Sequence, residues 1–284
     1  ERVIAMYHGT EAGNMIAISK DPLLLNWDKL TGQPVIKLHP EDGPPELRVF
    51  DPCVWKKGDH YYSLSGGTLP HKPSGRRTRA NFLFKSQDLV KWEYLHPFIE
   101  EDHFTLVGDD GACPYFWPID DRYILLFFSH MSGGQALVGD YDKERDKFVV
   151  TSHHKFNFGP YGPSGIHAPS STPDGSGAVI TIFNMNSGVE NRGWNQIMSL
   201  PRQLSLIDDD PIGKDMLKVM PAGDVESLRR EHRQQKDLTL TANEERVLQG
   251  IEGKAIELSV EIDTKDAPMI ELNVFRSPGK EEFT

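Results

Sequence analysis

One type of apolar segment recurs four times along the chain, and this repeat constrains the fold more than any other feature of the sequence. The segments are Ile4–Gly9, Tyr61–Gly66, Tyr123–Ser129 and Ala178–Asn184, and their starts lie 57, 62 and 55 residues apart. A period of about 60 residues leaves room for several short strands per unit, which is typical of the four-stranded blades of a β-propeller. A meandering β-sandwich with a chance period is the alternative fold.

Two further features repeat in step with these segments. A proline stands near the start of the strand that precedes three of them, at Pro52, Pro114 and Pro169. Proline is tolerated there because the first residues of a strand need no ladder donor. Polar turns then join the two strands, as expected for hairpins; they are Lys56–Asp59, Asp120–Arg122 and Pro173–Gly177.

The segments after the apolar strands also correspond. Ser19-Lys20-Asp21 leads to Trp27, Ser86-Gln87-Asp88 leads to Trp92, and Gly139-Asp140-Tyr141 occupies the corresponding place in the next unit. We interpret the two tryptophans as residues that pack the blades. The repeats together favour the propeller and assign residues 1–206 to it.

The character of the chain changes after Leu206. Residues 207–236 are charged and predict a linker with a single helical turn, whereas residues 237–284 return to alternating strands. In Ala255–Asp263 every second residue is apolar, which predicts a half-buried strand. We therefore expect the start of a C-terminal β-sandwich, and we expect the natural protein to continue because half a sandwich would leave its inner face uncovered.

Composition excludes some classes of partner. The formal net charge is −11, with acids and bases mixed and no basic block, so nucleic acid is not an expected partner. No apolar run is long enough to span a bilayer, so no membrane partner is expected. Cys53 and Cys113 are the two cysteines, and two cysteines make no disulfide framework, so both are expected to be free and buried. No signal peptide is visible at the start of the chain.

Several motifs, taken in order, resemble one enzyme family. They are Phe50-Asp51-Pro52 with Trp55, Cys113–Pro118, Gly159–Ser171 with His167-Ala168-Pro169, Asn184-Met185-Asn186, and Gly193–Leu206 with its Ser-Leu-Pro-Arg run. This ordered set resembles glycoside hydrolase family 32, the invertase, inulinase and levanase family. The resemblance implies an all-β fold of a five-bladed β-propeller followed by a β-sandwich, here a fragment without the N-terminal blade and with a partial sandwich. It also implies hydrolysis of β-fructofuranosides of the sucrose, levan or inulin type.

Three positions depart from the pattern of that family. Its nucleophile is an aspartate on the first blade, and no residue of this chain aligns with it. Its acid/base glutamate stands directly before the cysteine, where this chain has Ala112. Its arginine before the aspartate is replaced by Phe50, although Arg48 lies two residues earlier.

The predicted chemistry needs carboxyl groups on either side of a glycosidic bond. In a propeller the innermost strands line the axis, so Asp51, Ala112 and His167 are expected to meet in one cavity. Asp51 resembles the transition-state stabiliser of the family, and a turn-capping role is the structural alternative. Asp110 is the candidate acid because a residue two positions before Ala112 points to the same face of a strand; a solvated Gly-Asp-Asp-Gly turn is the alternative.

The resemblance and the strand pattern suggest four substrate-binding residues, Arg48, Tyr115, Trp117 and His167. Tyr115 and Trp117 can stack on a sugar or pack in the core. His153 and His154 are interpreted as surface residues, and Ser129–Gly134 as a propeller loop. The histidine spacing shows no pattern of metal ligands, so neither a metal nor a cofactor is expected.

Three functions remain open from the sequence: an active hydrolase with a relocated acid, a non-catalytic carbohydrate-binding propeller that lost its acid/base, and related furanoside chemistry such as arabinofuranoside cleavage. The isolated fragment is expected to be inactive because an incomplete propeller leaves a strand edge unpaired. Export to the medium or periplasm is implied by the resemblance alone, and the oligomeric state is not fixed.

Overall fold

The computed structural model of the 284-residue chain describes residues 2–70, 75–157, 165–186, 193, 195–207, 215–253 and 255–275. The chain divides into two compact units, Glu1–Gly223 and Asp224–Thr284. Every regular element in the described residues is a β-strand, apart from one 3-10 turn. The predicted all-β class is therefore confirmed.

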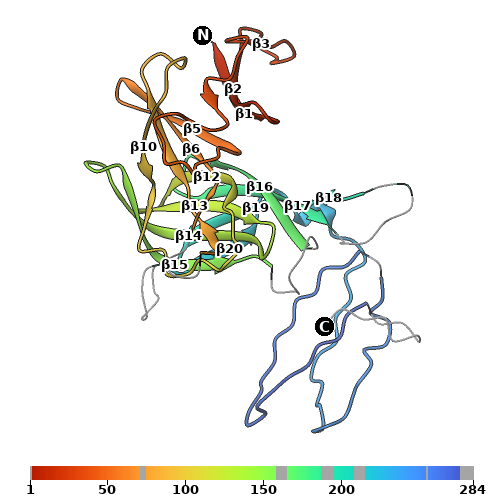
Figure 1. Ribbon diagram of the computed structural model, residues 1–284. Coiled ribbons are helices and arrows are strands. Elements are labelled where there is room, and N and C mark those ends of the chain that lie inside the picture. Colours follow the sequence, from red (N-terminus) through yellow and green to blue (C-terminus); the bar gives the residue numbers. More distant parts are fainter. Residues whose placement is uncertain are drawn as a thin grey trace. The chain divides into compact units, whose positions relative to one another are not determined.

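Unit 1 contains four mainly antiparallel sheets that follow one another along the chain, as Figure 1 shows. The first sheet has the order β1-β2-β3, with β4 paired to β2. Its strands are β1 (Val3–Gly9), β2 (Gly13–Ser19), β3 (Asp28–Lys29) and β4 (Ile36–Lys37).

The second sheet has the order β10-β9-β6-β5. Its strands are β5 (Pro52–Lys57), β6 (His60–Ser65), β9 (Phe82–Ser86) and β10 (Glu93–Pro97). Between β6 and β9 the chain makes a separate two-stranded hairpin of β7 (Thr68–Pro70) and β8 (Arg77–Arg79). The turn from β5 to β6 includes Gly58 at φ 58°, a conformation that glycine adopts at little cost.

The third sheet has the order β11-β15-β14-β13-β12, and β11 runs parallel to β15. Its strands are β11 (Ile99–Glu100), β12 (Ala112–Ile119), β13 (Arg122–Ser129), β14 (Gly133–Asp142) and β15 (Lys147–Lys155). The fourth sheet has the order β16-β17-β19-β20, with β18 paired to β17. Its strands are β16 (Gly165–Pro173), β17 (Val179–Asn186), β18 (Ile197–Met198), β19 (Arg202–Leu206) and β20 (Leu217–Pro221).

The three predicted hairpins are present. β5 pairs with β6, β12 with β13, and β16 with β17, all antiparallel, and each predicted proline lies within the first strand of its pair. The four recurring apolar segments correspond to β1, β6, β13 and β17. The sheets therefore have the propeller-like succession that the repeat predicted, with four blades in the described residues; a fifth blade stays a prediction.

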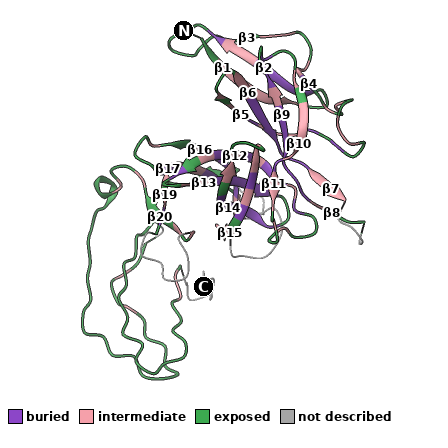
Figure 2. Cartoon of the chain, turned by 90° about the vertical axis from the view of Figure 1, so that its left-hand side faces the viewer, coloured by how far each residue is buried: buried purple, intermediate pink, exposed green. Residues whose placement is uncertain are grey.

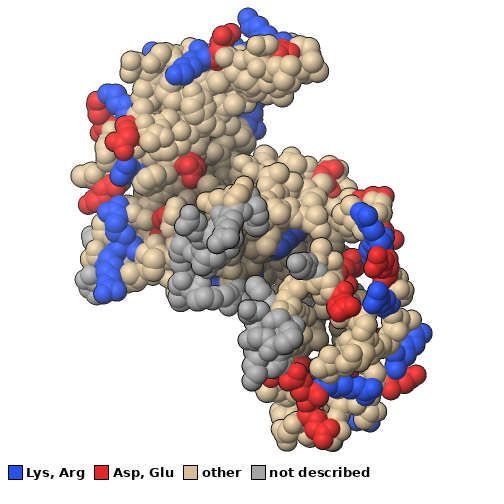
Figure 3. All heavy atoms as spheres, turned by 90° about the vertical axis from the view of Figure 1, so that its right-hand side faces the viewer, with Lys and Arg blue, Asp and Glu red and all other residues tan. Residues whose placement is uncertain are grey.

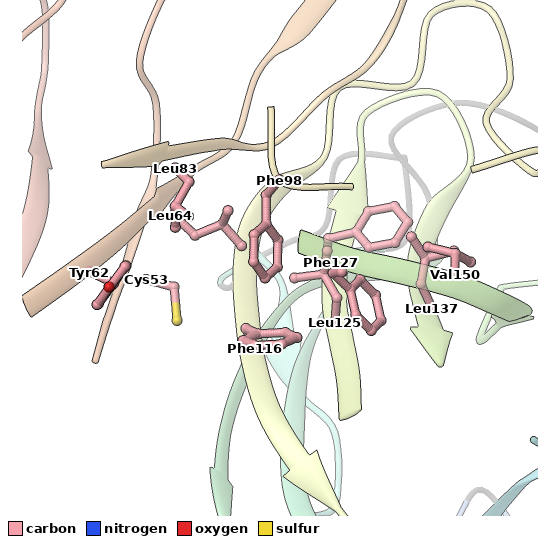
Figure 4. Close-up of a cluster of buried hydrophobic side chains, with 11 residues drawn as sticks. Cys53, Tyr62, Leu64, Leu83, Phe98, Phe116, Leu125, Phe127, Leu137 and Val150 are labelled. Atoms are coloured by element: carbon pink, nitrogen blue, oxygen red, sulfur yellow. The ribbon is translucent and has the colours of Figure 1, made fainter. Parts of the chain in front are cut away.

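Apolar side chains fill the space between successive sheets. One cluster joins the second and third sheets through Cys53, Tyr62 and Leu64 on one side and Leu125, Phe127 and Leu137 on the other, with Phe98 and Phe116 between them (Figure 4). A second cluster joins the third and fourth sheets, and a third joins the first and second. Because strands β12 and β13 contribute to two clusters, the two faces of the third sheet are both covered, and its strands are apolar on both sides.

The Ser-x-Asp segments form equivalent loops after β2 and β9. The Asp21 carboxylate accepts hydrogen bonds from the backbone N–H groups of Leu23, Leu25 and Asn26, and Asp88 accepts from those of Val90 and Lys91. These donors hold the pKa of both carboxyls below its ordinary value.

Each loop ends at a tryptophan whose indole N–H donates to a leucine carbonyl, Trp27 to Leu24 and Trp92 to Leu89. Trp92 packs against the core cluster of the first two sheets, as predicted. The packing prediction is wrong for Trp27, which is exposed. β3, to which Trp27 leads, has only two residues, both of them exposed, so no outer strand covers the ring.

β20 lies beyond the predicted end of the propeller at residue 206. It pairs with β19 over five residues and forms the outermost strand of the fourth sheet, so part of the predicted linker belongs to this blade. Unit 2 holds one regular element among its described residues, the 3-10 turn η1 (Glu226–Leu228), which matches the single helical turn predicted there.

The described residues of unit 2 are mostly exposed (Figure 2). The alternating residues predicted to line a half-buried strand, Ile256, Leu258, Val260 and Ile262, are all exposed in this unit. The C-terminal β-sandwich accordingly stays a prediction.

Candidate active site

Asp51 lies directly before β5 and reaches the start of the next innermost strand. Its Oδ2 accepts a hydrogen bond from the backbone N–H of Cys113 at 3.0 Å, and the Cys113 thiol lies 3.3 Å from the same oxygen. The backbone carbonyl of Asp51 accepts from the N–H of Gly66 at the end of β6. The carboxylate is therefore directed toward the start of β12, and the meeting of Asp51, Ala112 and His167 in one cavity stays a prediction.

The start of β12 is shaped by a β-bulge. Gly111 and Cys113 have φ values of 60° and 49°, and the pairing with β13 shifts register between Ala112 and Tyr115. β16 repeats the feature, with Ala168 at φ 34° and a register shift between His167 and Pro169. In both strands the bulged residue precedes the repeated proline. Bulges re-aim side chains and are frequent next to active sites.

The position expected to hold the acid contains only a methyl group. Ala112 is 8% exposed and lies directly opposite Phe128 in the β12–β13 ladder. The ring of Phe128 lies 4.5 Å from that of His167 and 4.8 Å from that of His130. The ladder partner of Ala112 thus contacts two imidazoles, whereas Ala112 itself offers no proton.

Asp110 points to a histidine that the sequence analysis did not identify. Its Oδ2 lies 2.6 Å from His130 Nδ1, and its Oδ1 accepts from the His130 backbone N–H at 3.3 Å. Its own backbone carbonyl accepts from the N–H of Gly67. The predicted loop Ser129–Gly134 is shorter in the structure: Ser129 ends β13, Gly133 and Gly134 begin β14, and only residues 130–132 form the turn. The sequence analysis treated this segment as a loop and therefore did not identify His130.

Asp109 is buried and connects the segment before β12 to the turn after β13. It is 0% exposed, and its Oδ1 accepts hydrogen bonds from the hydroxyls of Ser129 and Ser132 at 2.7 and 2.6 Å. Its Oδ2 accepts from the N–H of Leu106 at 2.8 Å and lies 3.6 Å from the guanidinium of Arg79. Because every oxygen is engaged, Asp109 serves structure, and it fixes the chain immediately before Asp110.

The charges around Cys113 keep its thiol protonated. Burial raises the pKa of Cys113, and the neighbouring carboxylates of Asp51 and Asp110 raise it further. Burial also raises the pKa of Cys53 to about 11. Both cysteines are free, as predicted, and Cys113 is half-buried. Neither is available as a thiolate nucleophile near neutral pH.

Arg48 lies beside the candidate site on the side of Asp51. It is exposed, and its guanidinium stands 5.2 Å from the centre of the Phe50 ring. Phe50, which replaces the expected arginine, in turn lies 6.0 Å from the ring of His8. Contact of Arg48 with a substrate stays a prediction.

Tyr115 and Trp117 face the fourth sheet. They belong to the cluster between the third and fourth sheets, and the Trp117 indole N–H donates to the hydroxyl of Ser171 at 2.9 Å. Burial raises the pKa of Tyr115, while a hydrogen bond with Ser170 acts in the opposite direction. These contacts support packing, the alternative kept in the sequence analysis, and contact with a sugar stays a prediction.

Three further histidines, His153, His154 and His167, are at least partly buried. His167 is buried at 8% exposure beside Phe128, and its role toward substrate stays a prediction. The surface assignment of His153 and His154 is wrong, because both are partly buried against neighbouring elements. His153 Nε2 lies 2.6 Å from Gln135 Oε1, and His154 Nε2 lies 2.8 Å from the carbonyl of Asp215.

Within the described residues, no three His, Cys, Asp or Glu side chains lie close enough together to hold a metal ion. In that same part of the chain, no helix has the length and apolar character needed to cross a bilayer.

Solved structures with the same fold are glycoside hydrolases. A family 32 β-fructofuranosidase of Bombyx mori is 21% identical and superposes with a TM-score of 0.60, over 81% of this chain and 50% of that chain. The sucrose-6-phosphate hydrolase of Lactobacillus gasseri is 17% identical with a TM-score of 0.56, over 81% and 48%. Sheets in propeller-like succession thus place the chain in the class of β-propeller folds that these two structures represent.

The sequence comparisons identify the family within that class. The model of the glycosyl hydrolases family 32 N-terminal domain matches residues 2–218, and the chain therefore belongs to this family. A sucrose-6-phosphate hydrolase of Zymomonas mobilis is 26% identical over 84% of this chain and 48% of its own length, and the levanase of Bacillus subtilis is 23% identical over 99% and 42%. The chain spans about half or less of the length of these relatives.

Proposed function

We propose that this chain carries part of the active site of a hydrolase that acts on β-fructofuranosides. Family membership supports hydrolysis of a glycosidic bond, and the names of the relatives, sucrose-6-phosphate hydrolase and levanase, support a fructoside as the substrate. On the face drawn in Figure 3, acidic and basic side chains are interspersed, which suits a ligand without strong charge.

The observation that carries the proposal is the position of Asp51. Its carboxylate projects from the start of β5 to the start of β12, where the chain places Cys113, Asp110 and Ala112 side by side. A carboxylate held there can accept hydrogen bonds from sugar hydroxyls, and such bonds strengthen as positive charge develops on the ring. We assign Asp51 the role of transition-state stabiliser.

The test is hydrolysis of sucrose, levan and inulin by the whole natural protein, followed as released reducing sugar. Asp51→Asn keeps the shape of the side chain and removes its charge, and kcat is expected to fall at least 100-fold, as for the loss of one electrostatic stabiliser. The matched control is Asp59→Asn in the exposed β5–β6 turn at the far end of the same strand, which should keep wild-type turnover. Equal activity of the Asp51 and Asp59 variants would reject the assignment.

A second candidate function rests on Ala112. A methyl group in place of a carboxylic acid favours a carbohydrate-binding propeller without catalysis. Under this alternative, calorimetry should detect binding of a fructoside while no reducing sugar is released. Hydrolysis should also be measured with arabinofuranosides. Release of sugar from these substrates, and not from fructosides, would indicate related furanoside chemistry instead.

A further inference from the structure

His130 follows β13 directly, two residues after Phe128, the ladder partner of Ala112. In the antiparallel ladder, Ala112 lies directly opposite Phe128, and directly opposed residues share a face. His130 lies in the turn directly after β13, two residues after Phe128, and its ring lies 4.8 Å from the Phe128 ring. A proton donor on His130 would therefore lie beside the ladder partner of position 112, where the acid is missing.

A carboxylate holds the imidazole of His130 in place. Asp110 Oδ2 lies 2.6 Å from Nδ1, and Oδ1 receives the backbone N–H of the same histidine. Since the carboxylate accepts at Nδ1, this nitrogen carries a proton, and Nε2 is the ring nitrogen that the carboxylate does not engage. The His130 side chain is 71% exposed, whereas that of Asp110 is 28% exposed, so the histidine, not the aspartate, is the accessible member of the pair.

The support for Asp110 is itself rigid. Asp109, one residue earlier, is anchored by two serine hydroxyls, and one of these, Ser129, is the neighbour of His130. The hydrogen bond between Ser129 and Asp109 thus holds the residue before His130 against the residue before Asp110. An imidazole oriented by a carboxylate through one nitrogen can exchange a proton through the other near neutral pH.

We propose that His130, oriented by Asp110, is the proton donor of this site; the proposal rests on the hydrolase function proposed above. Asp110, the acid predicted from the sequence, then becomes a positioning residue. In the first step the proton on His130 Nε2 passes to the glycosidic oxygen, which keeps both electrons of the breaking C–O bond and leaves as an alcohol. A carboxylate of the whole protein attacks the anomeric carbon as that bond breaks. In the second step His130 Nε2 takes a proton from water, whose oxygen displaces the carboxylate.

The hydrogen bond itself is tested without any turnover. In the chain with ¹⁵N-labelled histidine, NMR of the imidazole nitrogens at alkaline pH should show the neutral His130 ring with its proton on Nδ1. Asp110→Ala should move that proton to the tautomer found for unconstrained histidines, while His103→Gln, which removes an exposed histidine paired with Glu101, should leave the His130 signals unchanged. A His130 ring whose tautomer does not respond to Asp110→Ala would overturn the orienting role.

Proton donation is tested in the whole natural protein by the quality of the leaving group. For sucrose, His130→Gln should lower kcat about 100-fold or more, the usual contribution of a general acid. For a nitrophenyl fructoside, whose leaving group needs no proton, the loss should be less than about 10-fold. Asp110→Asn should give an intermediate loss on sucrose, and His103→Gln none on either substrate.

The outcomes separate the two proposals. Equal losses of His130→Gln on both substrates, or no loss, would reject His130 as the donor while the hydrolase function stands. A wild-type protein that releases no sugar from any fructoside would reject the hydrolase function, and proton donation by His130 with it.

Discussion

Three aspartates near the start of the innermost strands have three different environments. Asp109 is buried, and hydroxyl and backbone donors engage both its oxygens; Asp110 faces an exposed histidine, and Asp51 faces the backbone of a neighbouring sheet. From the sequence, Asp51 was assigned through the Asp-Pro motif that marks a strand start, and Asp110 through its spacing from Ala112. Sequence spacing does not distinguish Asp109 from Asp110, since their partners Ser129, Ser132 and His130 come from the next strand and its turn.

At the residue scale, partly buried His153 makes stability depend on pH. Burial lowers its pKa from 6.5 to about 4, with the positive charges of Arg79 and Lys155 acting in the same direction. The unfolded chain therefore binds more protons than the folded chain between these two values. The free energy of unfolding should be highest above pH 6.5 and should fall as the pH falls toward 4.

Urea unfolding at several pH values measures this slope. His153→Gln removes the titrating group and should make the dependence on pH shallower in the window between about 4 and 6.5; part of the slope should remain because burial also lowers the pKa of His154. An unchanged slope in the variant would show that His153 titrates alike in the folded and unfolded chains.

At the element scale, the bulges determine how the strands present their side chains. The repeated prolines predicted the starts of β5, β12 and β16, but not the register shifts that follow Ala112 and His167. Those shifts depend on positive φ at Cys113 and Ala168, residue types for which no local preference predicts such a conformation. The strand positions were thus accessible from the sequence, whereas the directions of Tyr115 and Trp117 were not.

Gly111 provides a test of this corner. At φ 60°, a Cβ would lie 2.9 Å from Arg79 Cγ, and Arg79 cannot move easily because its buried guanidinium is paired with Asp102. Gly111→Ala should therefore lower the free energy of unfolding by about 2–4 kcal/mol, the sum of backbone strain and overpacking.

Gly58→Ala is the matched control for that variant. Gly58 has a similar φ of 58°, but a Cβ there meets nothing within 4 Å, so only the backbone cost of about 1–2 kcal/mol is expected. Urea unfolding of both variants measures the two losses in free energy of unfolding. Equal losses would mean that the backbone at Gly111 adjusts to the added methyl group and does not hold Asp110 rigidly.

At the scale of the whole molecule, one edge of β1 has no partner strand within the described residues. In the described residues β1 pairs with β2 alone, although an innermost strand precedes the corresponding β6, β13 and β17. The residues of β1 include no charge and no proline, the two devices that commonly protect an edge strand from pairing with another chain.

We expect the chain to self-associate through this edge. Sedimentation velocity should show a concentration-dependent increase in mass, and Ala5→Lys should reduce it because lysine on an edge strand opposes pairing. Leu23→Lys adds the same charge at an exposed residue after β2 and should leave the association intact. Association that both lysines reduce equally would indicate a general charge effect instead.

The sequence by itself determined the all-β class, the order of the hairpins and the family, because a repeated alternation of apolar strands, prolines and polar turns is a local property of the chain. It also indicated Asp51. Only the tertiary structure decided which side chains meet: Asp109 meets the hydroxyls of Ser129 and Ser132, Asp110 meets the imidazole of His130, and the β12–β13 ladder pairs Ala112 with Phe128. Such neighbours come from separate strands, and their proximity depends on register and backbone conformation, which short-range sequence patterns do not encode.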